Sequence, residues 1–158
     1  MALLFLTSGR VNAVLRIRKG QFKEIEELQH RYKFIDPDIL ILENFQVSKR
    51  KKGKQKPVID IPLPRIGNLS PFTKLVEDYL SYLSGEPDET KLFPFGQSRT
   101  WVIVNHYTGG YDKDGDLVGK WCHWFRSQSL SYNVNLIGSE LRVAKQRGIE
   151  NPQTIAHY

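Results

Sequence analysis

Three side chains toward the carboxyl end of the chain have the chemistry for nucleophilic attack on a phosphodiester. His123 and Arg126 form an H-x-x-R pair in 123-HWFR-126, and Tyr158 stands 32 positions after Arg126. An arginine can hold two phosphate oxygens in its fork, a histidine can carry a proton, and a tyrosine can form a covalent bond. The pattern is short, so its meaning depends on the elements that position these residues.

The composition indicates one basic globular domain of 158 residues, long enough to bury a core. The formal net charge of +6 predicts a polyanionic partner. The single cysteine, Cys122, excludes an internal disulfide and a cysteine-rich zinc site, and we expect it to be a small buried apolar residue. No apolar run approaches 18 residues, so we expect no membrane span.

Lysine and arginine are concentrated in one short stretch between two apolar segments. The basic residues there are Lys49, Arg50, Lys51, Lys52, Lys54 and Lys56. The flanking segments, 39-ILILENFQV-47 and 58-VIDIPL-63, are rich in β-branched residues and predict a β-hairpin. The basic stretch is either a solvated loop or a phosphate-contacting hairpin, because clustered cations release counterions from DNA.

Apolar periodicity predicts helices over most of the remaining chain. We expect helical segments over 2–6, 11–17, 21–34, 70–83, 98–107 and most of 122–158, with breaks near Gly138 and at 148–152. Ser70 and Ser98 are the expected helix caps, and Pro71 suits a first helical position. Residues 109–119 form a loop whose DKDGD pattern lacks the glutamate that a calcium loop needs. The fold class is therefore mainly helical α+β with a small antiparallel sheet.

Five segments in order make the chain similar to the catalytic domain of a tyrosine recombinase, the integrase family of phages, plasmids, bacteria and archaea. Two short stretches, 121-WCHWFRS-127 and N-P-Q-T before the tyrosine, suggest a local similarity to integrases of archaeal mobile elements. The segments are the T-S-G-R turn within 3–17, the basic hairpin ending in I-P-L, 92-LFPFGQSRTWVIVNHYTG-109, the H-x-x-R pair and 147-RGIENPQTIAHY-158. The family's integrase-like catalytic core is α+β and mainly helical.

The resemblance implies a set of catalytic residues and a reaction. The implied residues are Arg10, Lys54, His123, Arg126 and Tyr158. Counting back from the proline of I-P-L selects Lys54 as the catalytic lysine, and Lys52 and Lys51 stay open as alternatives. DNA strands would be cleaved and rejoined through a 3′-phosphotyrosyl link, with neither metal nor ATP. The other basic residues of the hairpin would contact the DNA.

The chain departs from the family pattern after Gly148. Ile149 stands where the family has a histidine or tryptophan that donates a hydrogen bond to the phosphate. Removing such a donor costs about 2.7–4 kcal/mol of transition-state stabilisation. His157 or a backbone N–H is a candidate substitute. A smaller departure is Ser127, where the family commonly has a histidine.

The resemblance also implies a context for the domain. We expect residues 1–158 to be the catalytic domain, without the family's amino-terminal core-binding domain and without a tail after the tyrosine. The last turn, from about Thr154, is expected to be displaced, which would weaken activity. The expected partners are double-stranded DNA attachment sites and further copies that assemble into a synaptic tetramer. The expected location is the cytoplasm of a prokaryotic host of a virus or plasmid.

Two other interpretations remain open. The chain could be a DNA-binding module that kept the fold and lost the chemistry, as Ile149 suggests. It could also be a basic helical domain that binds RNA or a protein partner. Convergence of Arg10, Lys54, His123 and Arg126 in one cleft distinguishes the recombinase from this last possibility.

Overall fold

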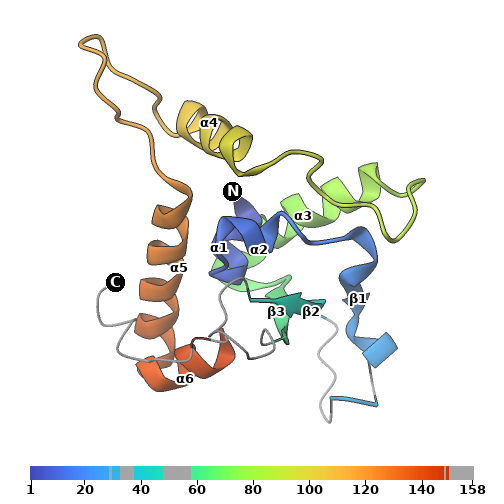
Figure 1. Ribbon diagram of the computed structural model, residues 1–158. Coiled ribbons are helices and arrows are strands. Elements are labelled where there is room, and N and C mark those ends of the chain that lie inside the picture. The colour runs from blue at the N-terminus through green and yellow to red at the C-terminus, as the bar shows by residue number, and fades with distance from the viewer. Residues whose placement is uncertain (29, 33–37, 48–57, 148, 150–158) are drawn as a thin grey trace, which may run out of the picture.

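The computed structural model describes residues 1–28, 30–32, 38–47, 58–147 and 149. Helices surround a three-stranded antiparallel sheet, which confirms the predicted mainly helical α+β class. Helix α1 (Ala2–Thr7) lies between α5 (Cys122–Ile137) and α3 (Ser70–Tyr82), with the sheet beneath it (Figure 1). Within the described residues, no helix combines the length and apolarity needed to cross a bilayer.

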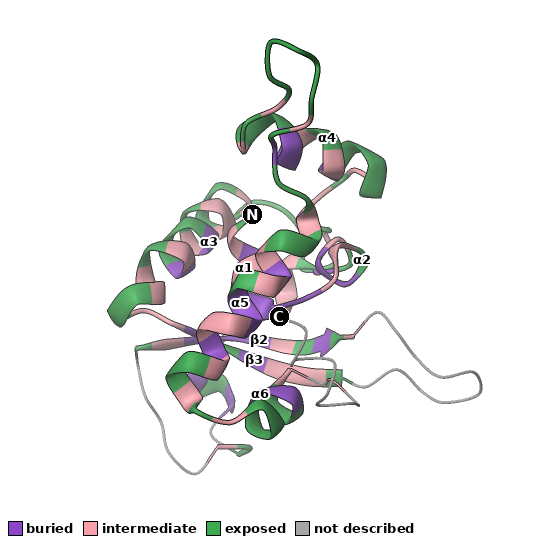
Figure 2. Cartoon of the chain, turned by 90° about the vertical axis from the view of Figure 1, so that its left-hand side faces the viewer, coloured by how far each residue is buried: buried purple, intermediate pink, exposed green. Residues whose placement is uncertain are grey.

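The sheet contains the predicted hairpin. Strand β2 (Ile39–Gln46) pairs with β3 (Val58–Pro64), and β1 (Phe22–Glu24) pairs with the other edge of β2. Leu42 and Ile61 face each other in this register and are fully buried, so the sheet forms the floor of the main core. The cartoon coloured by burial shows the two long strands side by side beneath α1 and α5 (Figure 2).

The prediction of a helix over 21–34 is wrong for the described part of that range. Residues 22–24 form β1, and Ile25–Leu28 form a single 3₁₀ turn. The physical reason is tertiary, because Ile25 and Leu28 are buried against Ile41 of β2 in a small separate apolar cluster. Pairing with the open edge of β2 satisfies backbone groups that an isolated short helix would leave to water.

The amino-terminal helical pieces are confirmed, although the second is shorter than predicted. Helix α1 ends at Ser8, which adopts the left-handed conformation with φ of 49°. Helix α2 (Val11–Val14) has only four residues. Residues 8–10 therefore form a sharp turn between the two helices. Arg10 is its last residue and the N-cap of α2.

Where the chain is described, the remaining predicted helices are present, with different caps; the helical segment expected after residue 152 lies outside the described residues. They are α3, α4 (Gln97–Tyr107), α5 and α6 (Glu140–Gln146). Leu69 and Gly96 occupy the N-cap positions expected for Ser70 and Ser98. Ser70 lies inside its helix, and its hydroxyl donates to the Gly67 carbonyl over 2.8 Å. Gly138, with φ of 68°, ends α5 at the predicted break.

Candidate functional site

A pocket of about 300 Å³ lies where the start of α2, the start of α4 and the start of α5 meet. Its lining includes Arg10, His123 and Arg126, together with Asn12, Gln97, Trp101, Trp121 and Cys122. Arg10 is 113 positions before His123 in the sequence. The fold thus brings both arginines and the histidine to one cavity.

The corner before Arg10 is held by its own hydrogen bonds and by the sheet. The Thr7 hydroxyl donates to the Leu3 carbonyl over 2.6 Å and accepts from the Gly9 amide over 2.9 Å. A Cβ at position 9 would lie 2.7 Å from Thr7 Oγ1 and 2.8 Å from Cζ of Phe45. A side chain larger than hydrogen at position 9 would therefore displace Thr7 or Phe45 and with them the corner that leads to Arg10.

Arg126 is buried, with 6% of its surface exposed, and is fixed to that corner. Its Nη1 donates a hydrogen bond to the backbone carbonyl of Ser8. One turn further along α5, Ser129 Oγ lies 2.6 Å from Ser8 Oγ. A buried guanidinium is tolerated only when it is hydrogen-bonded, and here the bond joins the helix of Arg126 to the loop that presents Arg10.

His123 lies one turn before Arg126 on α5, at a spacing that places both on the same helix face. Burial lowers the pKa of His123 below its ordinary value, and the charges of Arg126 and Arg10 lower it further. The imidazole is therefore neutral at pH 7. A neutral imidazole beside two cations can accept a proton from a nucleophile that enters the pocket.

Several pocket residues were not predicted from the sequence. Gln97 and Trp101 come from consecutive turns of α4, and Trp121 immediately precedes α5. Trp121 had a signal in the sequence, because it stands two residues before His123, whereas Gln97 and Trp101 reach the pocket only through the fold. Cys122 is half-buried rather than fully buried, and burial raises the pKa of its thiol.

Ile149 lies away from the pocket. It packs against an apolar cluster of Leu130, Val143 and Ala144 between α5 and α6, and its N–H donates to the Ala144 carbonyl over 2.8 Å. Its aliphatic side chain thus has a packing role where the family pattern has a phosphate donor.

A polar contact at the end of α6 also escaped the sequence analysis. Arg147 Nη2 donates to Asn133 Oδ1 over 3.1 Å, and Asn133 Nδ2 donates to the Ser129 carbonyl over 2.7 Å. Burial lowers the pKa of Arg147 to about 10. Together with Ser8 and Ser129, these residues form a polar track along one side of α5.

The other predicted site residues lie outside the described residues. They are Lys49, Arg50, Lys51, Lys52, Lys54, Lys56, Thr154, His157 and Tyr158. Where the chain is described, no group of three or more histidine, cysteine, aspartate or glutamate side chains is arranged to hold a metal ion.

Comparisons with protein-family models, with curated proteins and with solved structures found no match for this chain. Its class is therefore defined by the structure alone: a mainly helical α+β domain with a three-stranded antiparallel sheet. Its site is a pocket lined by two arginines and a neutral histidine.

Proposed function

We propose that the protein is the catalytic domain of a tyrosine-type site-specific DNA recombinase, an integrase that cleaves and rejoins DNA strands. The observation that supports this proposal is that Arg10, His123 and Arg126 line one pocket. Two guanidinium groups can hold a phosphate, and an imidazole beside them can accept a proton during attack on a phosphodiester. The basic sequence between β2 and β3 supplies further positive charge for a nucleic-acid partner.

The two arginines would bind the scissile phosphate. Guanidinium groups hold non-bridging oxygens through charge-assisted hydrogen bonds and neutralise the charge that grows in the pentacoordinate state. Because Arg126 is fixed by the Ser8 carbonyl, one of the two cations is already oriented when the phosphate arrives. Pre-orientation of this kind lowers the barrier without reorganisation during the reaction.

His123 and Lys54 would transfer the protons of the reaction. The phenolic oxygen of Tyr158 attacks phosphorus, and its proton passes to neutral His123. The bond from phosphorus to the 5′ oxygen breaks, and that oxygen takes a proton from Lys54, or from Lys52 or Lys51 if either occupies this role. The product is a 3′-phosphotyrosyl link, which a second DNA 5′-hydroxyl reverses by the same steps.

The same proposal covers the context of the reaction. The substrate is a double-stranded attachment site, and copies of the protein assemble on paired sites as a tetramer. The enzyme acts in the cytoplasm of a prokaryotic cell that carries the mobile element.

Covalent trapping tests this function directly. The protein is incubated with a pool of nicked duplexes of randomised sequence, and denaturing gels reveal DNA that migrates with the protein. We expect an adduct that Tyr158→Phe abolishes. Tyr107→Phe serves as the matched control, because Tyr107 is a surface tyrosine on α4 with 71% of its area exposed. An adduct that persists in Tyr158→Phe contradicts the assigned nucleophile.

The second candidate is a DNA-binding module with weakened chemistry. Ile149 favours it, because that side chain packs in an apolar cluster and can donate no hydrogen bond to a phosphate. The trapping experiment separates the two candidates. Duplex binding without any adduct supports the module and contradicts the recombinase.

A further inference from the structure

A second polar hollow, with a volume of about 520 Å³, lies at the other end of α2 from the candidate active site. Its polar lining consists of Arg16, Arg18, Gln21, Asn44, Gln46 and Lys91. The candidate active site is lined by residues at the start of α2, whereas this hollow is lined by residues that follow it. We call it the second basic hollow.

The charges in the second basic hollow have one sign. Three cations line it and no carboxylate does. Among the described residues, no carboxylate forms an ion pair with Arg16, Arg18 or Lys91, and all three are exposed. Other cations of the chain have such partners, as Arg65 does in Glu24 and Glu77. An anion that enters the hollow would therefore meet three cations and no opposing carboxylate.

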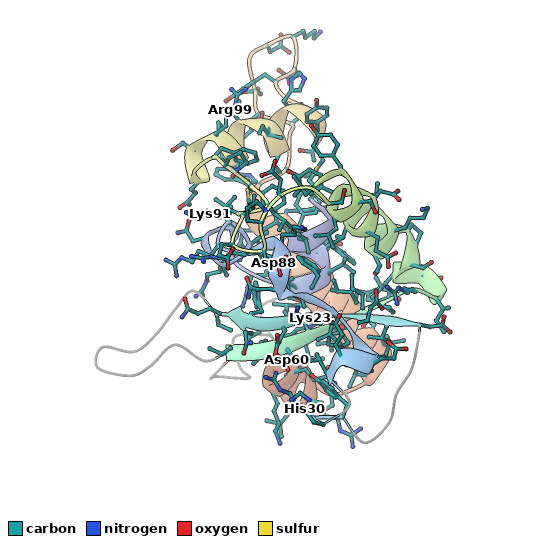
Figure 3. The ribbon with its side chains drawn as sticks, turned by 90° about the vertical axis from the view of Figure 1, so that its right-hand side faces the viewer. Lys23, His30, Asp60, Asp88, Lys91 and Arg99 are labelled. Carbon is teal, nitrogen blue, oxygen red and sulfur yellow. The ribbon has the colours of Figure 1, made fainter. Side chains whose placement is uncertain are left out.

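The backbone holds two of these cations opposite each other. Arg18 and Lys91 form an antiparallel bridge, and the Leu92 amide donates to the Ile17 carbonyl over 3.1 Å beside it. Like charges directly opposite in an antiparallel pair are destabilising. Figure 3 shows Lys91 next to the segment that follows α2. The backbone bridge therefore places two cations side by side, where one bound anion can interact with both.

Hydrogen bonds and burial hold the backbone around the hollow. Ile17 is almost fully buried beneath it, with 1% of its surface exposed. Gln21 Nε2 donates to the carbonyls of Glu43 and Asn44 over 2.9 and 3.1 Å, which ties the segment after α2 to β2. Gln21 Oε1 accepts from the Arg18 amide over 2.9 Å. The cations thus stand on a preformed frame.

We propose that the second basic hollow binds a backbone phosphate of the same DNA duplex whose scissile phosphate occupies the candidate active site. This inference rests on the proposed function and adds a second point of contact to it. Arg10 immediately precedes α2 and Arg16 follows it, so the two cations belong to opposite ends of this four-residue helix.

In the sequence, the basic segment follows one edge of the hollow closely. Gln46, on its rim, stands three positions before Lys49, the first of the six basic residues between β2 and β3. The order along the chain is therefore candidate active site, α2, second basic hollow and basic segment. Such an order suits a partner with regularly repeated negative charge, and double-stranded DNA has that property.

Salt-dependent binding of duplex DNA tests the inference. Fluorescence anisotropy with a labelled duplex is measured over a series of salt concentrations for Arg16→Gln, Lys91→Gln and the double variant. Each lost phosphate contact lowers the slope of log K against log salt by about 0.9 and weakens binding about eightfold at 0.1 M salt. The double variant is expected to show about twice the loss of slope.

Two control variants separate site-specific effects from net charge. Lys74→Gln removes one positive charge from α3, where Lys74 pairs with Asp78 over 3.0 Å, and it is expected to keep the wild-type slope within experimental error. Arg16→Lys keeps the charge in the hollow and is expected to restore most of the slope. All substituted side chains are exposed, so we expect every variant to keep the fold. Thermal unfolding of each variant checks this.

The outcomes distinguish this inference from the proposed function. If Arg16→Gln and Lys91→Gln bind like Lys74→Gln, the second contact is overturned, even when the Tyr158 adduct forms. If both variants lose slope but no adduct ever forms, the contact stands and the recombinase activity is overturned. If binding of a single-stranded RNA depends on Arg16 and Lys91 while duplex binding does not, the DNA assignment is overturned. A wild-type protein that binds no duplex overturns both proposals.

Discussion

The hydroxyl oxygens of Ser8 and Ser129 lie 2.6 Å apart and join the corner before Arg10 to the helix that carries His123 and Arg126. Both residues are buried, with 1% of their surface exposed. Their separation of 121 positions makes this contact a cross-link between distant parts of the chain. The relative placement of the two arginines depends on it.

Ser129→Ala is expected to lower the free energy of unfolding by about 1–3 kcal/mol, because it leaves the buried Ser8 hydroxyl without its partner. The double variant with Ser8→Ala should cost less than the sum of the two single variants, since the unpaired hydroxyl is then gone. Urea unfolding measures both quantities. Ser127→Ala, one helical turn from His123 on α5, is the control and should change stability by less than about 0.5 kcal/mol. Equal costs at 127 and 129 would contradict the cross-link.

Gly9→Ala is expected to destabilise the protein by about 1–3 kcal/mol through overpacking. The added methyl group meets Thr7 and Phe45 at distances that require both to move. Because the same corner directs Arg10, affinity for duplex DNA should fall as well. Gly85→Ala is the matched control, since nothing lies within 4 Å of a Cβ there. Thermal unfolding and anisotropy measure the two effects, and a stable Gly9→Ala protein with full DNA affinity would refute the argument.

The pKa of His123 should depend on the positive charges of Arg126 and Arg10. Its pKa lies below the ordinary 6.5 because burial and the charges of Arg126 and Arg10 disfavour the protonated form. Adduct formation should therefore be independent of this group at neutral pH and fall as acid protonates it. Arg10→Gln removes one of the charges and should raise the pKa of His123, as measured by the imidazole resonance in NMR.

Lys74→Gln serves again as the control for that titration. It lowers the net charge of the protein by one, as Arg10→Gln does, but the substituted residue lies on α3. A pKa of His123 that does not respond to Arg10→Gln would show that the two side chains are not neighbours in solution.

Asn133→Ala is expected to cost about 1–3 kcal/mol, since it removes the acceptor from Arg147 Nη2. Arg147→Met should cost less, because it removes the charge whose burial lowers that pKa to about 10. Urea unfolding gives both values. Arg142→Ala on exposed α6 surface is the control. A larger cost for Arg147→Met than for Asn133→Ala would contradict this account of the polar track.

The elements with strong local signals were predictable from the sequence. The stripe of apolar residues over 70–83, the β-branched segments at 39–47 and 58–63, and the stop at Gly138 all correspond to elements of the structure. The structure of the described part of 21–34 was not predictable, because Ile25 and Leu28 pack against Ile41 of β2 and this contact cannot be read from local periodicity.

Some residues of the candidate site were predictable from the sequence, and others were not. The H-x-x-R spacing and the T-S-G-R turn pointed to Arg10, His123 and Arg126, and the fold brings these three together. Gln97, Trp101 and the Ser8–Ser129–Asn133–Arg147 track depend on contacts between distant segments, for which a single sequence carries no signal. Ile149 shows its packing role only once α5 and α6 are placed. The roles of Lys54 and Tyr158 stay predictions.

The bond from Arg126 to the Ser8 carbonyl has one more consequence. It joins the side chain of Arg126 to the backbone of the turn that leads to Arg10, so a displacement of that turn would disturb the position of both cations. Under the proposed function, an incoming phosphate would meet one guanidinium that already has a fixed backbone partner.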